Sequence, residues 1–262
     1  EDALADTLAR MARRGVLPAG HFGALVQAEL AAPMDKMFGD YAQVLAAWPQ
    51  ALPDVLLDYL PAGQDEALRL LDWLGGLRAN DAGARCRVLL ESTGLVKNRR
   101  YRRDKLLPFW VAHVAGHLGG EALSTVIVSK AGTVTLAPLA AEDARQYWDV
   151  VLQAWQQGLT MPLPLALRTG LAWLEAQGPA GDTPQAVGWQ KARACYEGDD
   201  SMFSRAEMAD SAYLARAFPR FEDLWADGAF VRWTQALLGP LEGAVQKMAK
   251  VRTAPALTKL AV

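Results

Sequence analysis

The stretch ALSTVIVSKAGTVTLAPL, which begins at Ala122, contains the clearest β-hairpin pattern in the chain and requires a sheet in whatever fold the chain adopts. Apolar and polar residues alternate on both arms around a Lys-Ala-Gly turn. On this pattern Val126 and Val128 are expected to face Val134 and Leu136 across the hairpin.

Three further apolar runs, at 54–60, 67–78 and 84–92, are typical of strands. The Asn-Asp-Ala-Gly sequence between the second and third favours a hairpin turn, because Asn, Asp and Gly tolerate positive φ. Gly75 and Gly76 interrupt the second run and are expected to form a bulge within one strand.

The remaining segments show helical spacing of apolar residues. The order of elements predicts an α/β fold: one mixed central sheet of about five strands, flanked by helices, with extra C-terminal helices. A single domain over 1–262 is expected, with a helical lead-in (1–50), a sheet unit (51–165), a helical appendix (166–250) and a flexible tail (251–262). The helical segments lie at 1–14, 22–48, 103–118, 140–158, 164–177, 184–197, 205–217 and 228–250.

Composition limits the classes of function. The apolar content of 52% with 21% charged residues is globular, and a net charge of −2 means that binding to nucleic acid must depend on local clusters of cations. Cys86 and Cys195 have no metal-ligand spacing, so a reducing cytoplasm is expected. No apolar run approaches the roughly 20 residues that span a bilayer, and the chain reads as a domain of a larger soluble protein.

One such cluster of cations follows the third strand. Six of the nine residues from 97 to 105 are basic, and four of these are Arg, whose planar guanidinium suits phosphate oxygens. An aromatic side chain within the run could stack on an unpaired base. The run is therefore a candidate DNA-binding segment, although a solvated surface loop has the same composition. The candidate residues are Lys97, Arg99, Arg100, Tyr101, Arg102, Arg103 and Lys105.

Glu91 ends the same strand in the way that an acid ends a strand of many metal-dependent nucleases. Such sites need a second carboxylate and a Lys that steadies the attacking water. Thr93 stands two residues later, where that Lys belongs, although Lys97 could replace it. Asp72 is the candidate second acid. The pattern favours a degenerate nuclease site, with no metal or other cofactor, over an active one.

Two histidines stand four residues apart on the expected helix 103–118, which is the spacing of a zinc-binding pair. His113 is followed by Val114 and not by the Glu of a metalloprotease, and no third ligand lies near His117. Buried structural histidines are expected. Five tryptophans on apolar faces are expected in the core and a sixth, Trp73, nearer the surface; the five are Trp48, Trp110, Trp148, Trp155 and Trp173.

Several stretches together resemble the C-terminal domain of RecC, the gamma subunit of exodeoxyribonuclease V and the non-motor chain of the RecBCD helicase–nuclease. The resemblance runs over about residues 15–200. It is carried by GVLPAGHFGALV (15–26), DWLGGL (72–77), PFWVAHVAGHLGG (108–120), TVTLAPLAAEDARQYWDVVLQAWQQGLTMPLPL (133–165) and QKARACYEG (190–198).

The resemblance implies a restriction-endonuclease-like fold that has lost its catalytic residues, in agreement with Glu91 and Thr93. It also implies contacts with RecB- and RecD-type motor subunits and a loop, the pin, that divides incoming duplex DNA. The hairpin before Glu91 is where the pin is expected, with phosphates meeting an arginine on either side. Its residues are Arg78, Ala79, Asn80, Asp81, Ala82, Gly83, Ala84 and Arg85.

Three functions follow. The first is a non-catalytic scaffold that binds double-stranded, forked or single-stranded DNA in a double-strand-break repair complex, with its C-terminal helices docked on a motor subunit. The second is an active metal-dependent nuclease that uses Glu91 and Asp72. The third is a protein-interaction domain whose basic run faces an acidic partner. No membrane contact is expected.

Overall fold

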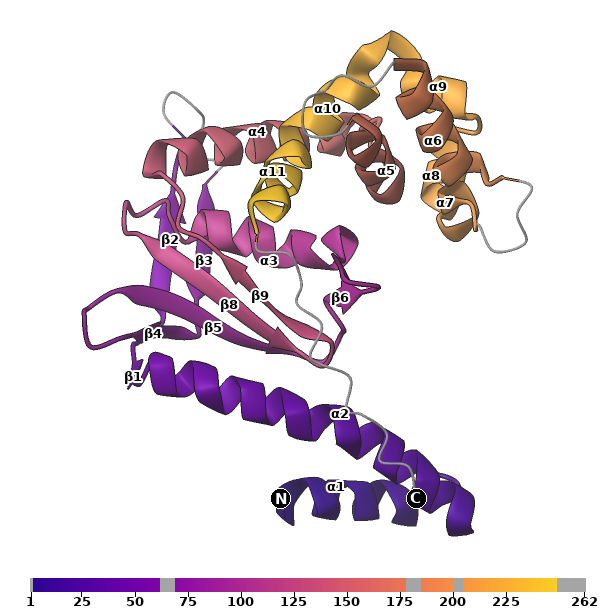
Figure 1. Cartoon of the computed structure of the whole chain (residues 1–262). Helices are drawn as coiled ribbons and strands as arrows, with labels where there is room; N and C mark the ends of the chain where they lie inside the picture. The colour runs from indigo at the N-terminus through magenta and orange to yellow at the C-terminus, as the bar shows by residue number, and fades with distance from the viewer. Residues whose placement is uncertain (1, 62–68, 178–184, 200–204, 249–262) are drawn as a thin grey trace.

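The computed structural model describes residues 2–61, 69–177, 185–199 and 205–248. A mixed sheet forms the centre of the molecule (Figure 1). Helix α2 (Gly20–Ala47) crosses one face of the sheet, and α3 (Arg103–Ala115) and α4 (Ala141–Thr160) lie over the other. Among the helices in these ranges, none combines the length and the hydropathy of a membrane span. The predicted tail 251–262 lies outside the described residues.

The main sheet has five strands in the order β1 (Gln50–Ala51), β4 (Leu77–Ala79), β5 (Arg85–Glu91), β8 (Leu123–Ser129) and β9 (Gly132–Leu136). Strands β5 and β8 are parallel, and α3 connects them; the other neighbours are antiparallel. The predicted mixed sheet of about five strands is confirmed.

The predicted single strand over 67–78 is wrong. Gly75 and Gly76 divide it into β3 (Leu70–Leu74) and β4, and only β4 joins the main sheet. Strand β3 pairs instead with β2 (Val55–Tyr59) in a separate two-stranded ribbon. Gly76 has φ of +77°, which glycine adopts without strain, and this conformation redirects the chain between the two sheets.

The predicted facing of Val126 and Val128 with Val134 and Leu136 is also wrong by one residue. Ile127 pairs with Val134, whereas Val126 and Val128 pair with threonines on β9. The cause is that β8 is a central strand with apolar residues on both faces. Its valines pack under α2 and Ile127 packs under α3, so alternation could not reveal which face was which.

The principal core lies between the sheet, α3, α4 and α11 (Gly239–Lys247). Its fully or almost fully buried residues come from distant parts of the chain: Leu106, Trp110, Val114, Ile127, Val134, Leu136, Tyr147, Trp148 and Leu241. The predicted core position of Trp155 on α4 is wrong, since its side chain is 52% exposed, and Trp48 is half-buried. Trp73 is exposed, as expected.

A helical lobe, formed by residues 167–177, 185–199 and 205–237, has a core of its own around Trp173, Tyr196, Phe221 and Phe230. The expected single helix over 228–250 is wrong, because the chain breaks at Leu238 and then turns back to the sheet as α11. The lobe contains α5 (Leu167–Gln177), α6 (Gln185–Glu197), α7 (Glu207–Asp210), α8 (Ala212–Ala217), α9 (Phe221–Trp225), a 3-10 turn (Ala226–Gly228) and α10 (Ala229–Leu237).

The N-terminal helix α1 (Asp2–Arg13) packs on α2 and lies away from the sheet (Figure 1). The predicted helix over 22–48 is confirmed as α2, which continues through Pro33. Met37 and Tyr41 anchor its second half against the valines of β5 and β8.

Candidate nucleic-acid interface

The basic run folds as a small hairpin between β5 and α3. Strand β6 (Val96–Lys97) pairs antiparallel with β7 (Arg100–Tyr101), and Asn98 and Arg99 form the turn with φ of 51° and 62°. Two successive left-handed residues define a type I′ turn. The basic hairpin, residues 96–101, was not predicted, because two-residue strands are too short to show alternation; the Asn at the turn was the only local signal.

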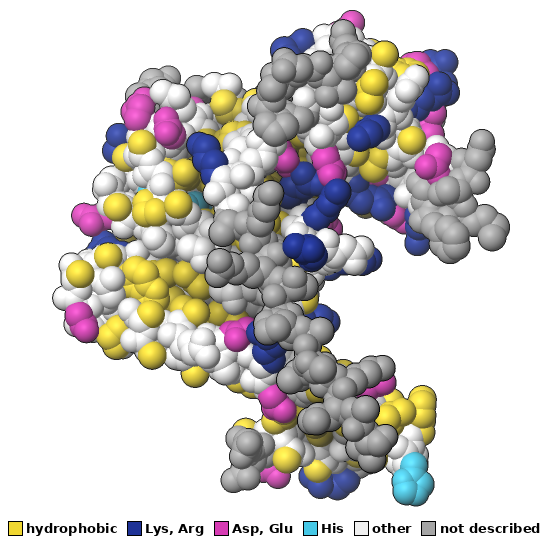
Figure 2. Space-filling view, viewed as in Figure 1, with side chains coloured by type: hydrophobic (Ala, Val, Ile, Leu, Met, Phe, Trp, Pro, Cys, Tyr) yellow, Lys and Arg dark blue, Asp and Glu magenta, His cyan; other side chains and the backbone are white. Residues whose placement is uncertain are grey.

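The basic hairpin presents cations to solvent. Lys97 and Arg99 are exposed, and in the described part of the chain neither makes an ion pair. Arg100 is also mostly exposed. Figure 2 shows Lys and Arg side chains gathered over the hollow between this hairpin and the helical lobe. The hollow therefore has a positively charged wall.

Arg103 is different, because it lies inside the molecule at the joint between α3 and the lobe. It donates to both carboxylate oxygens of Glu242 on α11, at 2.9 and 2.8 Å, and to Glu175 on α5 at 2.8 Å. The side chains of Arg103 and Glu242 are only 18% and 9% exposed. Burial alone would lower the pKa of Arg103, but Glu242 and then Glu175 outweigh it and raise the pKa.

Glu175 connects this joint to the basic hairpin. One of its oxygens accepts from Arg103 and the other accepts from Arg100 at 2.9 Å. The other members of the run have local partners. Arg102 donates to the Gly94 carbonyl at 3.2 Å, and both Arg102 and Lys105 lie 3.8 Å from Asp104. Tyr101 is half-buried, and burial raises the pKa of its hydroxyl.

The two candidate nuclease acids lie in different sheets. Glu91 ends β5 and accepts a hydrogen bond from the Thr93 backbone amide at 2.6 Å. Asp72 is on the β2–β3 ribbon and accepts from the Trp73 amide at 2.7 Å. Among the residues that the structure describes, no group of three or more His, Cys, Asp or Glu side chains could hold a metal ion.

The expectation that His113 and His117 are buried is confirmed, but α3 ends at Ala115, so His117 lies in the turn after the helix; the ring nitrogens of both are saturated by hydrogen bonds. His117 Nδ1 donates to the His113 carbonyl at 2.8 Å, while its Nε2 accepts from the amides of Leu123 and Leu139. His113 Nε2 donates to the Ala137 carbonyl at 3.0 Å and its Nδ1 accepts from Thr125. Burial, and then the charge of His117, lowers the pKa of His113 to about 4. Both rings join α3 to the sheet.

The segment expected to be the pin forms the tight β4–β5 turn. Asn80 Oδ1 accepts from the amides of Ala82 and Ala84, and Gly83 has φ of +77°. Arg78 donates to the carbonyls of Trp48 and Pro49 at the end of α2. Arg85 forms an ion pair with Glu121 at 3.6 Å. Both arginines that were expected to meet phosphates thus have partners within the chain.

Comparison with known proteins identifies one family. Residues 1–178 match the model of the RecC C-terminal domain. No curated protein matches the chain. RecC is the gamma subunit of exodeoxyribonuclease V, the RecBCD complex of DNA repair and recombination. Because the match covers more than half of the sequence, the chain belongs to the RecC C-terminal domain family.

Proposed function

We propose that this domain is a non-catalytic scaffold that binds DNA within a RecBCD-type helicase–nuclease, beside RecB- and RecD-type motor subunits. The observation that carries the proposal is the basic hairpin, which holds Lys97, Arg99 and Arg100 exposed at the edge of a positively charged hollow. Lys97 and Arg99 make no ion pair in the described part of the chain and are available to phosphate oxygens, whereas Arg100 contacts Glu175. Replacement of counterions by such cations drives binding to DNA.

The surroundings of the hairpin favour its interpretation as a binding surface and not as a disordered charged loop. Its strands are paired, its turn has a defined conformation, and Arg103 at the start of α3 bonds to Glu175 of the lobe. Arg99 therefore has a defined position, which lowers the entropy that DNA binding would cost. Arg102 and Lys105 share the single carboxylate of Asp104 and so leave a net positive charge beside the hairpin, whereas Arg103 is neutralised by Glu242.

The strand-separating pin stays a second part of this proposal. The compact β4–β5 turn, held by Asn80, has the rigidity that a wedge needs. If replacing residues 80–84 with a Gly-rich turn left unwinding by the reconstituted complex unchanged, the pin would have to be sought elsewhere.

We also propose that the domain descends from a restriction-endonuclease-like nuclease whose catalytic site has degenerated. This ancestry would account for the absence of a catalytic role. A parallel β5–β8 pair with antiparallel strands on both sides and a crossing α3 is compatible with that fold. The alternative, an active nuclease, requires Glu91 and Asp72 to share a metal, yet they belong to the main sheet and to the ribbon respectively. Their separation in the fold favours the scaffold.

The test is fluorescence anisotropy of the chain with a labelled forked duplex, over a range of salt concentrations, first in EDTA and then in Mg²⁺. The variant Lys97→Ala/Arg99→Ala removes two exposed cations. The matched control, Lys36→Ala/Arg145→Ala, removes two exposed cations from α2 and α4. We expect binding in EDTA and intact DNA in Mg²⁺. In the hairpin variant only, the log–log salt slope should flatten by about 0.9 for each phosphate that the protein no longer neutralises.

Two other results would replace the proposal. Cleavage that requires Mg²⁺ and disappears in Glu91→Ala would establish a nuclease. No binding even at low salt would make the basic hairpin a surface for an acidic protein, which is the third candidate function.

A further inference from the structure

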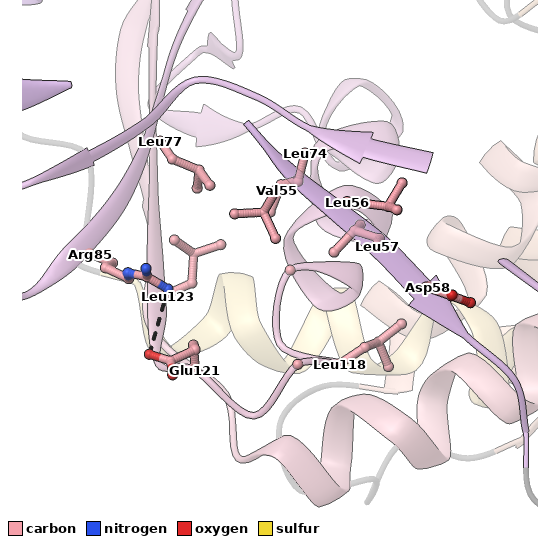
Figure 3. A pocket seen from close by; sticks show the side chains of 12 residues that line it. Val55, Leu56, Leu57, Asp58, Leu74, Leu77, Arg85, Leu118, Glu121 and Leu123 are labelled. Atoms are coloured by element: carbon pink, nitrogen blue, oxygen red, sulfur yellow. Dashed lines mark ion pairs between the residues drawn. The ribbon is translucent and has the colours of Figure 1, made fainter. Parts of the chain in front are cut away.

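A second surface, on the side of the β2–β3 ribbon, has the properties of a peptide-binding site. A pocket of about 180 Å³ lies between the ribbon and the end of α3. Figure 3 shows apolar side chains from both layers around it, with the Arg85–Glu121 ion pair at one side. The apolar side chains that line it include Val55, Leu57, Leu74, Leu77, Leu118 and Leu123.

The volume of the pocket limits the size of the group that can bind in it. Binding sites for small-molecule ligands are usually about 300–1,000 Å³, whereas a dry cavity of about 150 Å³ holds a molecule the size of benzene. The pocket therefore fits one Leu- or Phe-sized side chain.

Strand β2 supplies a backbone for that occupant. Four consecutive residues, 55–58, line the pocket, so one edge of β2 runs along it. Among the described residues β2 pairs only with β3, on its other edge. An open edge beside a side-chain pocket is the arrangement that binds an extended peptide as an added strand. A two-stranded ribbon is also marginally stable by itself and gains from a third strand.

The outer face of the ribbon is apolar as well. Leu56 and Trp73 are opposite each other, and Leu71 lies next to them on the same face. Leu71 and Trp73 are 61% and 64% exposed. In a strand added to β2, every second side chain would point to the pocket and the others would lie beside Leu56. The added strand would thus cover part of the apolar outer face.

The charges around the site are acidic. Arg69 pairs with Asp58 and Arg85 pairs with Glu121. Asp54 and Asp72 are exposed, and in the described ranges neither makes an ion pair. Two uncompensated carboxylates disfavour nucleic acid and favour a partner that carries Lys or Arg.

We infer that the β2 edge and its pocket bind an extended, positively charged segment of a partner protein, with a Leu or Phe side chain in the pocket. The inference is independent of the proposed DNA contact, since the basic hairpin belongs to a different sheet.

The experiment uses the whole chain and a fluorescein-labelled peptide of alternating Lys and apolar residues with a central Leu. The pocket is filled in Gly119→Leu, because Gly119 lines the pocket and a Cβ there would meet no atom within 4 Å. The control Gly39→Leu places the same side chain on α2, where a Cβ is equally unobstructed. The charge is removed in Asp54→Asn/Asp72→Asn, whose two positions are exposed.

We expect anisotropy to show binding that weakens at least tenfold in Gly119→Leu, severalfold in Asp54→Asn/Asp72→Asn, and not at all in Gly39→Leu. A peptide with a central Ala should bind at least tenfold more weakly, and one with Glu in place of Lys should not bind. Equal binding to Gly119→Leu, with an unchanged melting temperature, would overturn the inference. Displacement of the peptide by forked DNA, if it required Trp73, would also overturn it. So would a dimer of the chain, seen in sedimentation, that Gly119→Leu dissociates.

Discussion

Arg99 occupies a position where the backbone favours glycine and the proposed function favours a cation. A left-handed conformation costs a non-glycine residue about 1–2 kcal/mol, and Arg99 has φ of 62°. We expect Arg99→Gly and Arg99→Ala to weaken DNA binding equally. Glycine also has the larger backbone entropy in the unfolded chain, which offsets part of this difference. The free energy of unfolding of Arg99→Gly should therefore exceed that of Arg99→Ala by roughly 0.5–1 kcal/mol. Urea unfolding and anisotropy measure the two effects; unequal DNA affinities would contradict the phosphate role.

Glu175 holds a cation that DNA would also use. Its carboxylate accepts from Arg100 at 2.9 Å, and its negative charge repels phosphate. The variant Glu175→Gln should bind forked DNA severalfold more tightly, with a steeper salt slope because Arg100 is released. Arg103 keeps Glu242 in this variant. Glu142→Gln, an exposed acid on α4, is the control. Unchanged or weaker binding by Glu175→Gln would show that Glu175 positions Arg100 instead of competing for it.

At the scale of elements, predictability followed the length of the local pattern. Helices α2, α3 and α4 have several turns of periodic apolar residues and were predicted, as was the β8–β9 hairpin. The strands of the basic hairpin have two residues each, too few for a pattern. The predicted register of β8 against β9 was wrong because both faces of β8 are buried. The Arg103–Glu242 pair joins residues 139 positions apart, and no local pattern carries that information.

The stability of the junction between α3 and the sheet is expected to depend on pH. In the folded chain burial holds the pKa of His113 at about 4, whereas an unfolded histidine has a pKa of about 6.5. The unfolded chain therefore binds the extra proton first, so the stability from neutral His113 is present above pH 6.5 and is lost as the pH falls towards 4. We expect the free energy of unfolding to fall by roughly 2–3 kcal/mol between pH 7 and 4.5 from this residue.

Urea unfolding at several pH values measures that loss. In His113→Gln the change in unfolding free energy between pH 7 and 4.5 should be smaller by the same amount, whatever the variant's stability at pH 7. An identical pH dependence in the wild type and the variant would place the acid sensitivity in other groups.

At the scale of the whole molecule, the lobe and the sheet unit have separate cores, and Arg103 links them: it pairs with Glu242 on α11 in the sheet unit and with Glu175 on α5 in the lobe. Removing one partner of a buried ion pair costs about 3–5 kcal/mol. We expect Arg103→Ala to lose about 3 kcal/mol, since it leaves Glu242 buried without its cation and removes the contact with Glu175 of the lobe. Its unfolding, followed by circular dichroism and tryptophan fluorescence, should separate into two transitions. Glu222→Ala, which alters an exposed acid, should unfold like the wild type. A single transition in Arg103→Ala would mean that apolar packing joins the two parts.

The return of α11 to the sheet affects how this chain can be made. Leu241 is fully buried in the principal core, and the Tyr147 hydroxyl donates to the Leu237 carbonyl at 2.9 Å. During synthesis the first core thus stays open until nearly the last described residue has left the ribosome. A piece cut at residue 178, where the family match ends, would leave the apolar surfaces of α3 and α4 uncovered and prone to aggregate. The boundary of sequence similarity is therefore not a boundary of independent folding.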